Sequence, residues 1–317
     1  MFALTSDITV GSYKLQGVVD VTVRRSVNEL GATAIIKVPV TAVLRQNGIP
    51  TTRTETARAV KVGDPVCIRL GYDKRFATEF VGYVRRVNLR TPVEIECEDA
   101  YYLTRQRSVT LSGTQKLADV LKKCGLTVAY AEMLTLRNFV AADKSVAAVL
   151  ATLKKDYGLA IFFDLDGRVY ACRPAAVAGD NVVYELRRNV INDDDLQYHR
   201  ADDTKVYIKA IAFQKDGTKV EAKKGNESGA AKTLYFYNIS SMAELATLAQ
   251  AELERYSYDG YQGRITTFLE PYAAPAMVAV LTDPVYPERS GNYYIESVET
   301  TFGRSGGRRK VEISLKI

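Results

Sequence analysis

The chain has 317 residues, of which 47% are hydrophobic and 25% are charged. This length exceeds what one hydrophobic core usually serves, so a single small domain is excluded and two or three domains are expected. The composition is that of a globular protein rather than a disordered or membrane one. The net charge of +6 is mild, and basic residues are scattered as pairs such as Arg85-Arg86 and Arg308-Arg309. That pattern does not indicate a dedicated DNA-binding protein.

Targeting signals and cysteine spacing indicate the cellular compartment in which the protein is made. No apolar run approaches the roughly 20 residues that span a bilayer, and MFALTSDITV lacks the regions of a secretory signal. We therefore expect no membrane insertion and no export. The cysteines form no C-x-x-C pair and sit among apolar neighbours, so we expect four small core residues in a reducing cytoplasm. They are Cys67, Cys97, Cys124 and Cys172.

Residues 1–110 predict a first β domain, because runs such as Val18–Val23 and Ala34–Val38 are rich in β-branched residues. The segment Arg45–Arg58 is polar and contains Asn-Gly and Ile-Pro, which are loop signals. We expect a long exposed hairpin or flap there, of the kind that contacts a neighbouring molecule.

Residues 111–185 predict a small α+β insert with two helices. One stripe consists of Leu117, Val120, Leu121 and Cys124, and the other of Val146, Val149, Leu150 and Leu153. Gly125 and Gly158 are placed to end these helices, and Asp143 or Ser145 can cap the second. Apolar runs on either side of Asp166-Gly167 predict a tight β-hairpin that the helices cover.

Residues 186–317 return to strand patterns and predict a second β domain with one helix at about 241–256. The helix begins with a capping box, in which Ser241 can accept from the N3 amide and Glu244 can reach back. Its apolar stripe consists of Leu245, Leu248, Ala249 and Leu253.

The two predicted β domains share a weak internal repeat. Tyr83-Val84 precedes Val87 by the step that separates Tyr294-Ile295 from Val298. The strands that follow are Val93-Glu94-Ile95 and Val311-Glu312-Ile313. Upstream, residues 66–70 align with residues 277–281. The second copy has the longer turn, GRSGGRR, whose glycines permit the positive φ of hairpin loops.

Three stretches resemble the baseplate hub proteins of contractile phage tails, a family related to the hub part of type VI secretion spike proteins and including late control D-like proteins. KVGDPVCIRLGY…EFVGYV…VEIECED looks like the first tube domain of that family. KSVAAVLATLKKDYGLAIFFDLDGRVY resembles its middle segment, and SGNYYIESVETTFGRSGGRRKVEISL is similar to its closing hairpin. The N terminus departs from the family, because it is shorter and carries no matching motif.

The resemblance implies a mainly β fold, in which two similar tube-forming, barrel-like β domains flank the α+β insert. It implies a structural hub: a homotrimer whose six β domains form a pseudo-sixfold ring that adapts a hexameric tail tube to a trimeric central spike. Tape-measure and baseplate wedge proteins are further candidate partners, and DNA is cargo in the channel. The implied location is the virion tail baseplate, with the bacterial host cytoplasm during assembly. Closing sheets into a ring also covers their exposed edges.

Residues that favour catalysis or metal binding are few. His199, the only histidine, lies near Asp202 and Asp203, and a polar loop or strand-edge role is favoured over a triad or metal site. A lone histidine excludes the usual zinc sites. Asp193–Asp195 is the densest acidic cluster, and a solvated loop is favoured there over a divalent cation site.

Three further motifs have plain structural interpretations. DLDG at 164–167 starts like a calcium loop, but its glycine comes too early and Ala175 occupies position twelve. GRSGGRRK is followed by a strand rather than the helix of a phosphate loop. Gly63-Asp64-Pro65 predicts a turn before a strand in which Cys67 points into the core. We therefore predict no enzyme activity, no catalytic, cofactor-binding or metal residues, and no cofactor.

Two other functions stay open from the residues alone. Arginine pairs interleaved with 20 tyrosines are compatible with a nucleic-acid-binding β protein, for which steep salt dependence of DNA binding is the test. A carbohydrate-binding or carbohydrate-processing β protein is the third alternative. The absence of tryptophan speaks against it.

Overall fold

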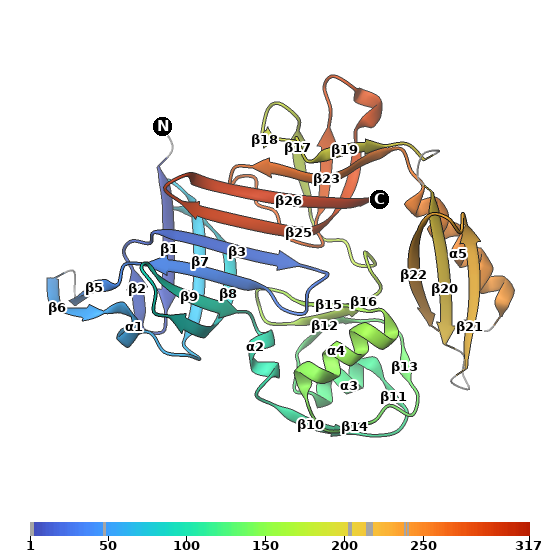
Figure 1. Ribbon diagram of the computed structural model, residues 1–317, viewed down its shortest axis with the longest axis horizontal. Helices are drawn as coiled ribbons and strands as arrows, with labels where there is room; N and C mark the ends of the chain where they lie inside the picture. The colour runs from blue at the N-terminus through green and yellow to red at the C-terminus, as the bar shows by residue number, and fades with distance from the viewer. Residues whose placement is uncertain (1–2, 47–48, 202–204, 214–217, 238, 240) are drawn as a thin grey trace.

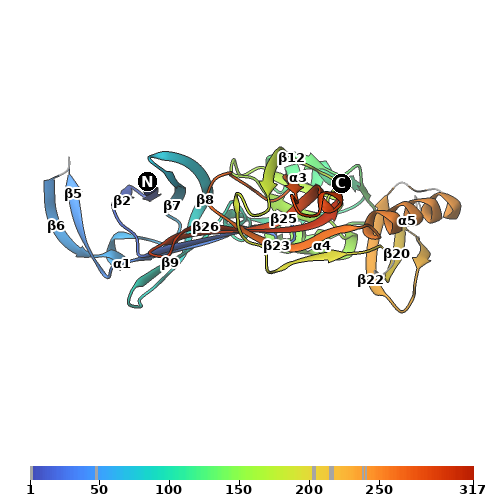
Figure 2. The same cartoon turned by 90° about the horizontal axis from the view of Figure 1, so that it is seen from above.

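The computed structural model describes residues 3–46, 49–201, 205–213, 218–237, 239 and 241–317. The molecule is elongated, with a large twisted sheet in the middle and smaller units at its ends and below it (Figures 1 and 2). The main sheet has 14 strands, and its principal path runs β18-β23-β26-β25-β3-β4-β9-β8-β7-β1-β2. It therefore contains strands from both predicted β domains.

The first β domain is built from alternating strands whose inward side chains form one core. In β4, for example, Ala34, Ile36 and Val38 are buried while the residues between them are not. Its strands are β1 Leu4–Val10, β2 Tyr13–Leu15, β3 Asp20–Ser26, β4 Thr33–Val38, β7 Pro65–Tyr72, β8 Arg75–Asn88 and β9 Val93–Glu98. The short helix α2, Tyr101–Thr104, leads out of it.

The predicted flap forms a hairpin, which we call the arm, residues 41–46 and 49–55. Its strands are β5 Thr41–Gln46 and β6 Ile49–Glu55, followed by the short helix α1, Thr56–Ala59. The arm projects from the end of the first β domain (Figures 1 and 2). Its base is fixed by the Thr56 hydroxyl, which donates to the Pro39 carbonyl at 2.6 Å.

The insert contains both expected helices, α3 Leu117–Lys123 and α4 Val146–Tyr157. Ser145, rather than Asp143, caps α4, because its hydroxyl accepts from the Ala148 amide at 3.2 Å. Gly125 and Gly158 follow the helices with φ of 72° and 64°. The expected hairpin joins β15 and β16. The strands are β10 Ser108–Leu111, β11 Gln115–Lys116, β12 Val128–Ala131, β13 Thr135–Leu136, β14 Ala141–Ser145, β15 Ala160–Phe163 and β16 Val169–Cys172.

The second β domain begins with β17, which lies inside the range predicted for the insert but pairs with β24. We therefore propose a boundary near residue 180. The strands are β17 Asn181–Glu185, β18 Val190–Asn192, β19 Leu196–His199, β23 Gly260–Thr267, β24 Val278–Thr282, β25 Gly291–Gly303 and β26 Gly306–Lys316, and the short 3-10 helix η1 spans Pro287–Arg289.

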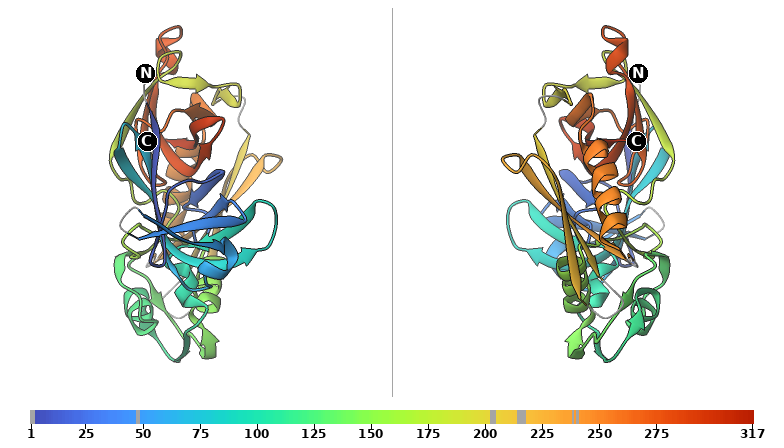
Figure 3. Two further views of the ribbon diagram at one scale, coloured as in Figure 1. Left: turned by 90° about the vertical axis from the view of Figure 1, so that its left-hand side faces the viewer. Right: turned by 90° about the vertical axis from the view of Figure 1, so that its right-hand side faces the viewer.

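Residues 206–213, 219–237 and 242–256 form a separate unit with a three-stranded sheet, which the sequence patterns did not distinguish from the second β domain. Its strands are β20 Val206–Phe213, β21 Lys219–Gly225 and β22 Ala230–Tyr237, in the order β21-β20-β22. The expected capped helix is α5, Met242–Tyr256, and it covers one face of this sheet with Leu245 and Ala249 (Figure 3). The Ser241 hydroxyl accepts from the Glu244 amide at 3.1 Å.

The two β domains have the same strand order. In the first the order is β3-β4-β9-β8-β7-β1, and in the second it is β18/β19-β23-β26-β25-β24-β17. Taken in chain order, the six strands occupy identical places in both. One difference is that β1 runs antiparallel to β7 whereas β17 runs parallel to β24. The fold is therefore mainly β with a small α+β insert, as expected, and its β part is duplicated.

The strand register corrects the aligned repeat by two residues. Val87 opposes Ile95, whereas Val298 opposes Val311. With Val87 and Val298 aligned, Ile95 rather than Val93 therefore occupies the place of Val311. A shift of two leaves every side chain on the same face of the sheet, which is why the sequence pattern could not reveal it.

Candidate functional site

The two β domains join through a continuous strand seam, the pairing of β3 with β25. Residues 20–26 run antiparallel to residues 297–303 over seven paired positions. On one face of the seam Arg24 and Glu299 oppose each other, with Nε and Oε2 2.6 Å apart. The duplicated domains are thus fused edge to edge, and each covers an edge of the other.

One face of the sheet is polar across the seam and carries opposite charges on neighbouring strands. Cross-strand ion pairs of this kind include Arg264–Glu312 at 3.5 Å, Lys37–Asp20 at 3.7 Å and Arg85–Glu96 at 2.7 Å. These side chains are at least partly exposed, so each pair contributes little stability. Together they leave the charges of this face largely compensated.

The opposite face of the seam holds a buried ion pair between Glu79 of β8 and Arg309 of β26. Glu79 lies at a β-bulge, because Ile68 opposes Phe80 and Arg69 opposes Thr78. The bulge turns its carboxylate inward. Burial raises the pKa of Glu79, while Arg309 and the Thr300 hydroxyl, which donates to it at 3.1 Å, lower it. A single glutamate in an apolar strand gave no sequence signal for this pair.

A connection from the second β domain also crosses the seam. Residues 268–277, which we call the crossing loop, follow β23, and Leu269 is only 2% exposed within the core of the first β domain. Arg309 donates to the carbonyls of Leu269 and Pro271. Tyr272 accepts from the Arg25 guanidinium at 2.9 Å. The buried arginine therefore holds the crossing loop in place.

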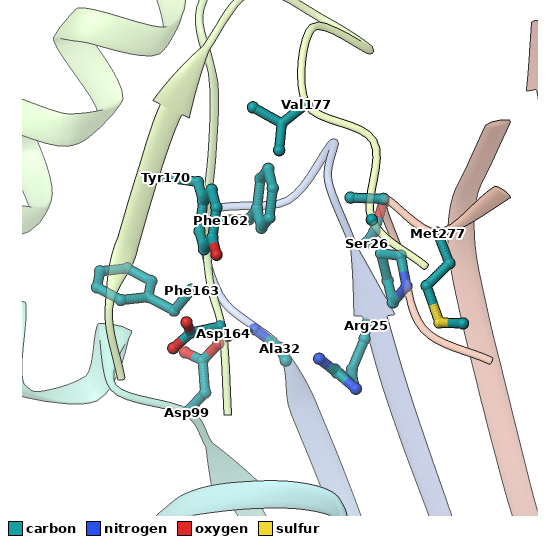
Figure 4. A pocket seen from close by; sticks show the side chains of 13 residues that line it. Arg25, Ser26, Ala32, Asp99, Phe162, Phe163, Asp164, Tyr170, Val177 and Met277 are labelled. Carbon is teal, nitrogen blue, oxygen red and sulfur yellow. Dashed lines mark hydrogen bonds between the residues drawn. The ribbon is translucent and has the colours of Figure 1, made fainter. Parts of the chain in front are cut away.

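A cavity of about 160 Å³ lies where the two β domains and the insert meet (Figure 4). Arg25 and Asp99 line it from the first β domain, and the parallel rings of Phe162 and Tyr170, 5.1 Å apart, line it from the insert. Asp99 accepts from the amides of Ala32 and Tyr101. Burial nevertheless raises the pKa of Asp99 to about 7.

The candidate catalytic and metal residues that the structure describes lie on β19 and in the turn before it. His199 ends β19 opposite Gly260. Asp202 and Asp203 lie outside the described residues. Asp193–Asp195 forms an exposed turn between β18 and β19, where the Asp194 amide donates to Asn192 Oδ1 at 3.0 Å. Across the described residues no group of three or more histidine, cysteine, aspartate or glutamate side chains is placed to hold a metal.

The turn motifs have the expected structural roles. Asp164 accepts from the amides of Asp166 and Arg168 at 3.0 and 2.8 Å, which closes the β15–β16 turn. In GRSGGRRK, Gly303 opposes Gly306 in a hairpin. Asp64 accepts from the Lys61 amide at 2.8 Å, one residue before β7 begins.

The cysteines follow the expectation with one exception. Cys97, Cys124 and Cys172 are buried, and burial raises the pKa of the Cys124 thiol to about 11. The expectation that Cys67 points into the core is wrong. Val66 and Ile68 on either side of it are the buried residues, so strand alternation places Cys67 on the other face.

Comparison with solved structures places the fold among phage tail proteins. The 43 kDa tail protein of prophage MuSo2 from Shewanella oneidensis is 17% identical with a TM-score of 0.59, covering 98% of this chain and 97% of that one. A tail protein from Neisseria meningitidis MC58 is 10% identical with a TM-score of 0.61, covering 98% and 96%. The E. coli c3393 protein, a type VI secretion system component, is 9% identical with a TM-score of 0.60, covering 98% and 77%.

Sequence comparison adds no assignment, since no protein-family model and no curated protein matches the chain. Among the described residues, no helix is long and apolar enough to cross a membrane. The likeness to solved structures rests on the arrangement of strands and not on shared side chains. The chain therefore has the fold of phage tail proteins.

Proposed function

We propose that this protein is a structural hub of a phage-tail baseplate, a homotrimer whose six β domains form a ring between a hexameric tail tube and a trimeric central spike. The observation that carries this proposal is the β3–β25 seam. It joins one β domain to its duplicate through an edge pairing that further copies can repeat. Repetition of such a head-to-tail contact closes into a ring when the rotation permits.

The edges required for repetition are present in each chain. β8 holds in the first β domain the place that β25 holds in the second, and β19 holds in the second the place of β3 in the first. The far edge of β8 beyond Val84 and the outer edge of β18 and β19 pair with no strand among the described residues. In the proposed ring, β19 of one copy adds to β8 of the next.

The internal seam predicts the register of this contact. Ile36 and Ile265 are equivalent because they oppose Ile95 and Val311. Three residues before Ile36, Thr33 opposes Arg24 of β3. Three residues before Ile265, Gln262 opposes Gln197 of β19. Gln197 is therefore the counterpart of Arg24, just as Asn88 is the counterpart of Glu299. The Arg24–Glu299 ion pair of the internal seam becomes a Gln197–Asn88 amide pair between copies.

Charge complementarity supports this register. Two residues beyond Asn88 stands Arg90, whose side chain is 75% exposed. Two residues before Gln197 stands Asp195, at the end of the exposed acidic turn. Arg90, which also pairs with Glu94 at 3.6 Å, and Asp195 lie just beyond the ends of β8 and β19, so this register brings them to the same end of the contact. Opposite charges that come together favour this strand pairing over other registers.

The compensated charges of the polar face favour this function over nucleic-acid binding. Arg24, Arg85 and Arg264 each lie in an ion pair with a glutamate on that face. A surface of this kind offers few unpaired cations to the phosphates of a nucleic acid. It therefore suits the wall of a channel better than a nucleic-acid-binding site. We infer a structural role without catalysis.

The test is disulfide crosslinking of Asn88→Cys with Gln197→Cys. The background is Cys67→Ser, because the other three cysteines are buried. We expect covalent trimers on non-reducing gels and trimers by light scattering at high concentration. Each single variant is the control and is expected to give no covalent trimer on the gel while still forming trimers by light scattering. A chain that remains monomeric in light scattering and uncrosslinked at high concentration overturns the ring.

A further inference from the structure

We propose that acid weakens the contact between copies in the ring, because the register of that contact places His199 opposite Arg86 of the next copy. This inference rests on the proposed function and adds a regulation to the same β8–β19 pairing. His199 is the one histidine of the chain, and histidine is the side chain whose charge ordinarily changes between about pH 5 and 8. An arginine keeps its charge throughout that range.

A shared irregularity fixes the place of Arg86 in the duplicated strands. β8 and β25 each carry a β-bulge immediately before Arg86 and Ser297. After the bulge, Arg86 opposes Glu96 of β9, and Ser297 opposes Glu312 of β26. A bulge interrupts the alternation of a strand, so two equivalent strands that carry one must match at it. Arg86 is therefore the counterpart of Ser297.

The facing strand is placed by the same equivalence. Gln197 of β19 is the counterpart of Arg24, so His199, two residues later, is the counterpart of Ser26. In the internal seam, Ser26 opposes Ser297. The contact between copies therefore sets a histidine against an arginine where the internal seam has two serines. Both residues lie within their strands, β19 and β8.

His199 and Arg86 also share one face of the sheet. Tyr198, which precedes His199, packs on the core of its domain, where its ring lies 5.5 Å from that of Tyr261. Val87, which follows Arg86, packs on the core of the first β domain. Strand alternation therefore places His199 and Arg86 on the opposite, polar face, where directly opposed side chains have Cβ atoms about 5 Å apart.

The surroundings of Arg86 leave a positive charge for His199 to meet. Arg85 lies 2.7 Å from one carboxylate oxygen of Glu96, and the Asn88 side chain donates to the other at 2.6 Å. These two partners hold the pKa of Glu96 below its ordinary value, so the carboxylate is ionised. One glutamate compensates only one of the two arginines. Protonated His199 therefore meets a net positive charge on the next copy.

Charged residues of the same chain also neighbour His199. They are Arg200, which follows it, Asp259, which precedes Gly260 on the facing strand, and Lys316, whose Nζ donates to the Asp259 carbonyl at 2.9 Å. These groups accompany His199 in a free copy and in the ring alike. The next copy adds the net positive charge and removes water, and both changes disfavour a charged imidazole. Free copies therefore bind the proton better, and by linkage assembly weakens as the pH falls.

The test is the pH dependence of assembly in the full chain, measured by light scattering as the protomer concentration at half-assembly at pH 8 and pH 5.5. Because three contacts weaken together, we expect this concentration to rise about threefold on acidification. His199→Gln and Arg86→Gln are each expected to remove that rise. Arg137→Gln, the matched control, removes an exposed arginine of the insert and is expected to keep it.

The failures of the two proposals are distinguishable. Trimers at pH 8 whose assembly concentration does not change with acid, or changes equally in the wild type and both variants, overturn the inference and leave the ring standing. A chain that stays monomeric at pH 8 overturns the ring itself.

A charge reversal tests the sign of the interaction. Arg86→Glu sets a carboxylate opposite His199, so acid is expected to strengthen assembly in this variant. Adding His199→Gln to Arg86→Glu is expected to abolish the strengthening, which isolates the interaction between the two side chains. Assembly of Arg86→Glu that weakens with acid as the wild type does contradicts the inference.

Discussion

At the scale of single residues, the Glu79–Arg309 pair is the strongest constraint on how the two β domains meet. Both side chains are buried, and they come from different domains. A buried pair of this kind stabilises little relative to apolar residues of similar volume, but losing one partner leaves an uncompensated charge. Its role is therefore to favour one register of the domains over others.

Glu79→Gln is expected to destabilise the protein by about 3–5 kcal/mol, because Arg309 remains buried without its carboxylate. Replacing both residues, as Glu79→Gln with Arg309→Met, is expected to restore much of this loss. Urea unfolding of the two variants and the wild type measures the difference. A single variant as stable as the wild type would show that Arg309 is neutralised by other groups.

Asp99 predicts a pH dependence of stability. Burial raises its folded pKa to about 7, above its ordinary value of 3.8. The stability that Asp99 contributes to the folded state is therefore fully present below about pH 4 and is lost as the pH rises through 7. Asp99→Asn is expected to flatten the change of the unfolding free energy between pH 4 and 8. The measurement is the slope of the urea-unfolding midpoint against pH. A slope in the variant equal to that of the wild type contradicts the prediction.

At the scale of elements, helix ends position the three-stranded unit against the insert. The Phe213 ring of β20 stacks on Tyr157, the last residue of α4, with centroids 5.1 Å apart. The Tyr237 hydroxyl donates to the Tyr157 carbonyl. A Cβ at Gly158 would come within 1.9 Å of the Tyr235 ring. Gly158, whose left-handed backbone ends α4, is thus also a point of contact between the insert and the three-stranded unit.

Gly158→Ala and Gly125→Ala form a matched pair of substitutions. Both glycines follow helices with positive φ, so each variant is expected to cost about 1 kcal/mol in backbone strain. A Cβ at Gly125 meets only the end of Arg107 at 3.1 Å. Gly158→Ala is therefore expected to cost more and to raise hydrogen exchange in residues 206–256, whereas Gly125→Ala does not. Equal exchange in both variants would argue against this contact.

Local elements were predictable from sequence because their causes are local. The α3 and α4 stripes, the Ser241 cap and the Asp166-Gly167 hairpin each depend on residues within a few positions. The three-stranded unit was missed because the alternation in β20 resembles that of any half-buried strand. Periodicity specifies a strand and its faces, but it does not specify which sheet the strand joins.

At the scale of the whole molecule, the seam could not be read from the sequence, since it pairs residues about 275 positions apart. Arg24 and Glu299 look like ordinary surface residues in their own segments. The repeat predicted two like domains, but their fusion depends on which edges face each other. The buried Glu79–Arg309 pair was hidden for the same reason, because the bulge that turns Glu79 inward depends on register.

The shared core predicts that the β domains do not separate. A fragment of residues 1–106 would lose Leu269 from its core and expose the β3 edge that β25 covers. We expect this fragment to aggregate when expressed alone and to become soluble when co-expressed with residues 107–317. Size-exclusion chromatography of the two preparations is the measurement. A soluble, monomeric fragment would show that the seam is dispensable for folding.

The internal seam also has a consequence for assembly kinetics. In the proposed ring, six domain contacts are needed, and fusion of the duplicated domains in one chain makes half of them intramolecular. Those contacts form at the high effective concentration of a tethered partner, independently of how much protein the cell has made. Only three contacts between separate molecules remain, and two encounters bring the three chains together, whereas six free domains would require five.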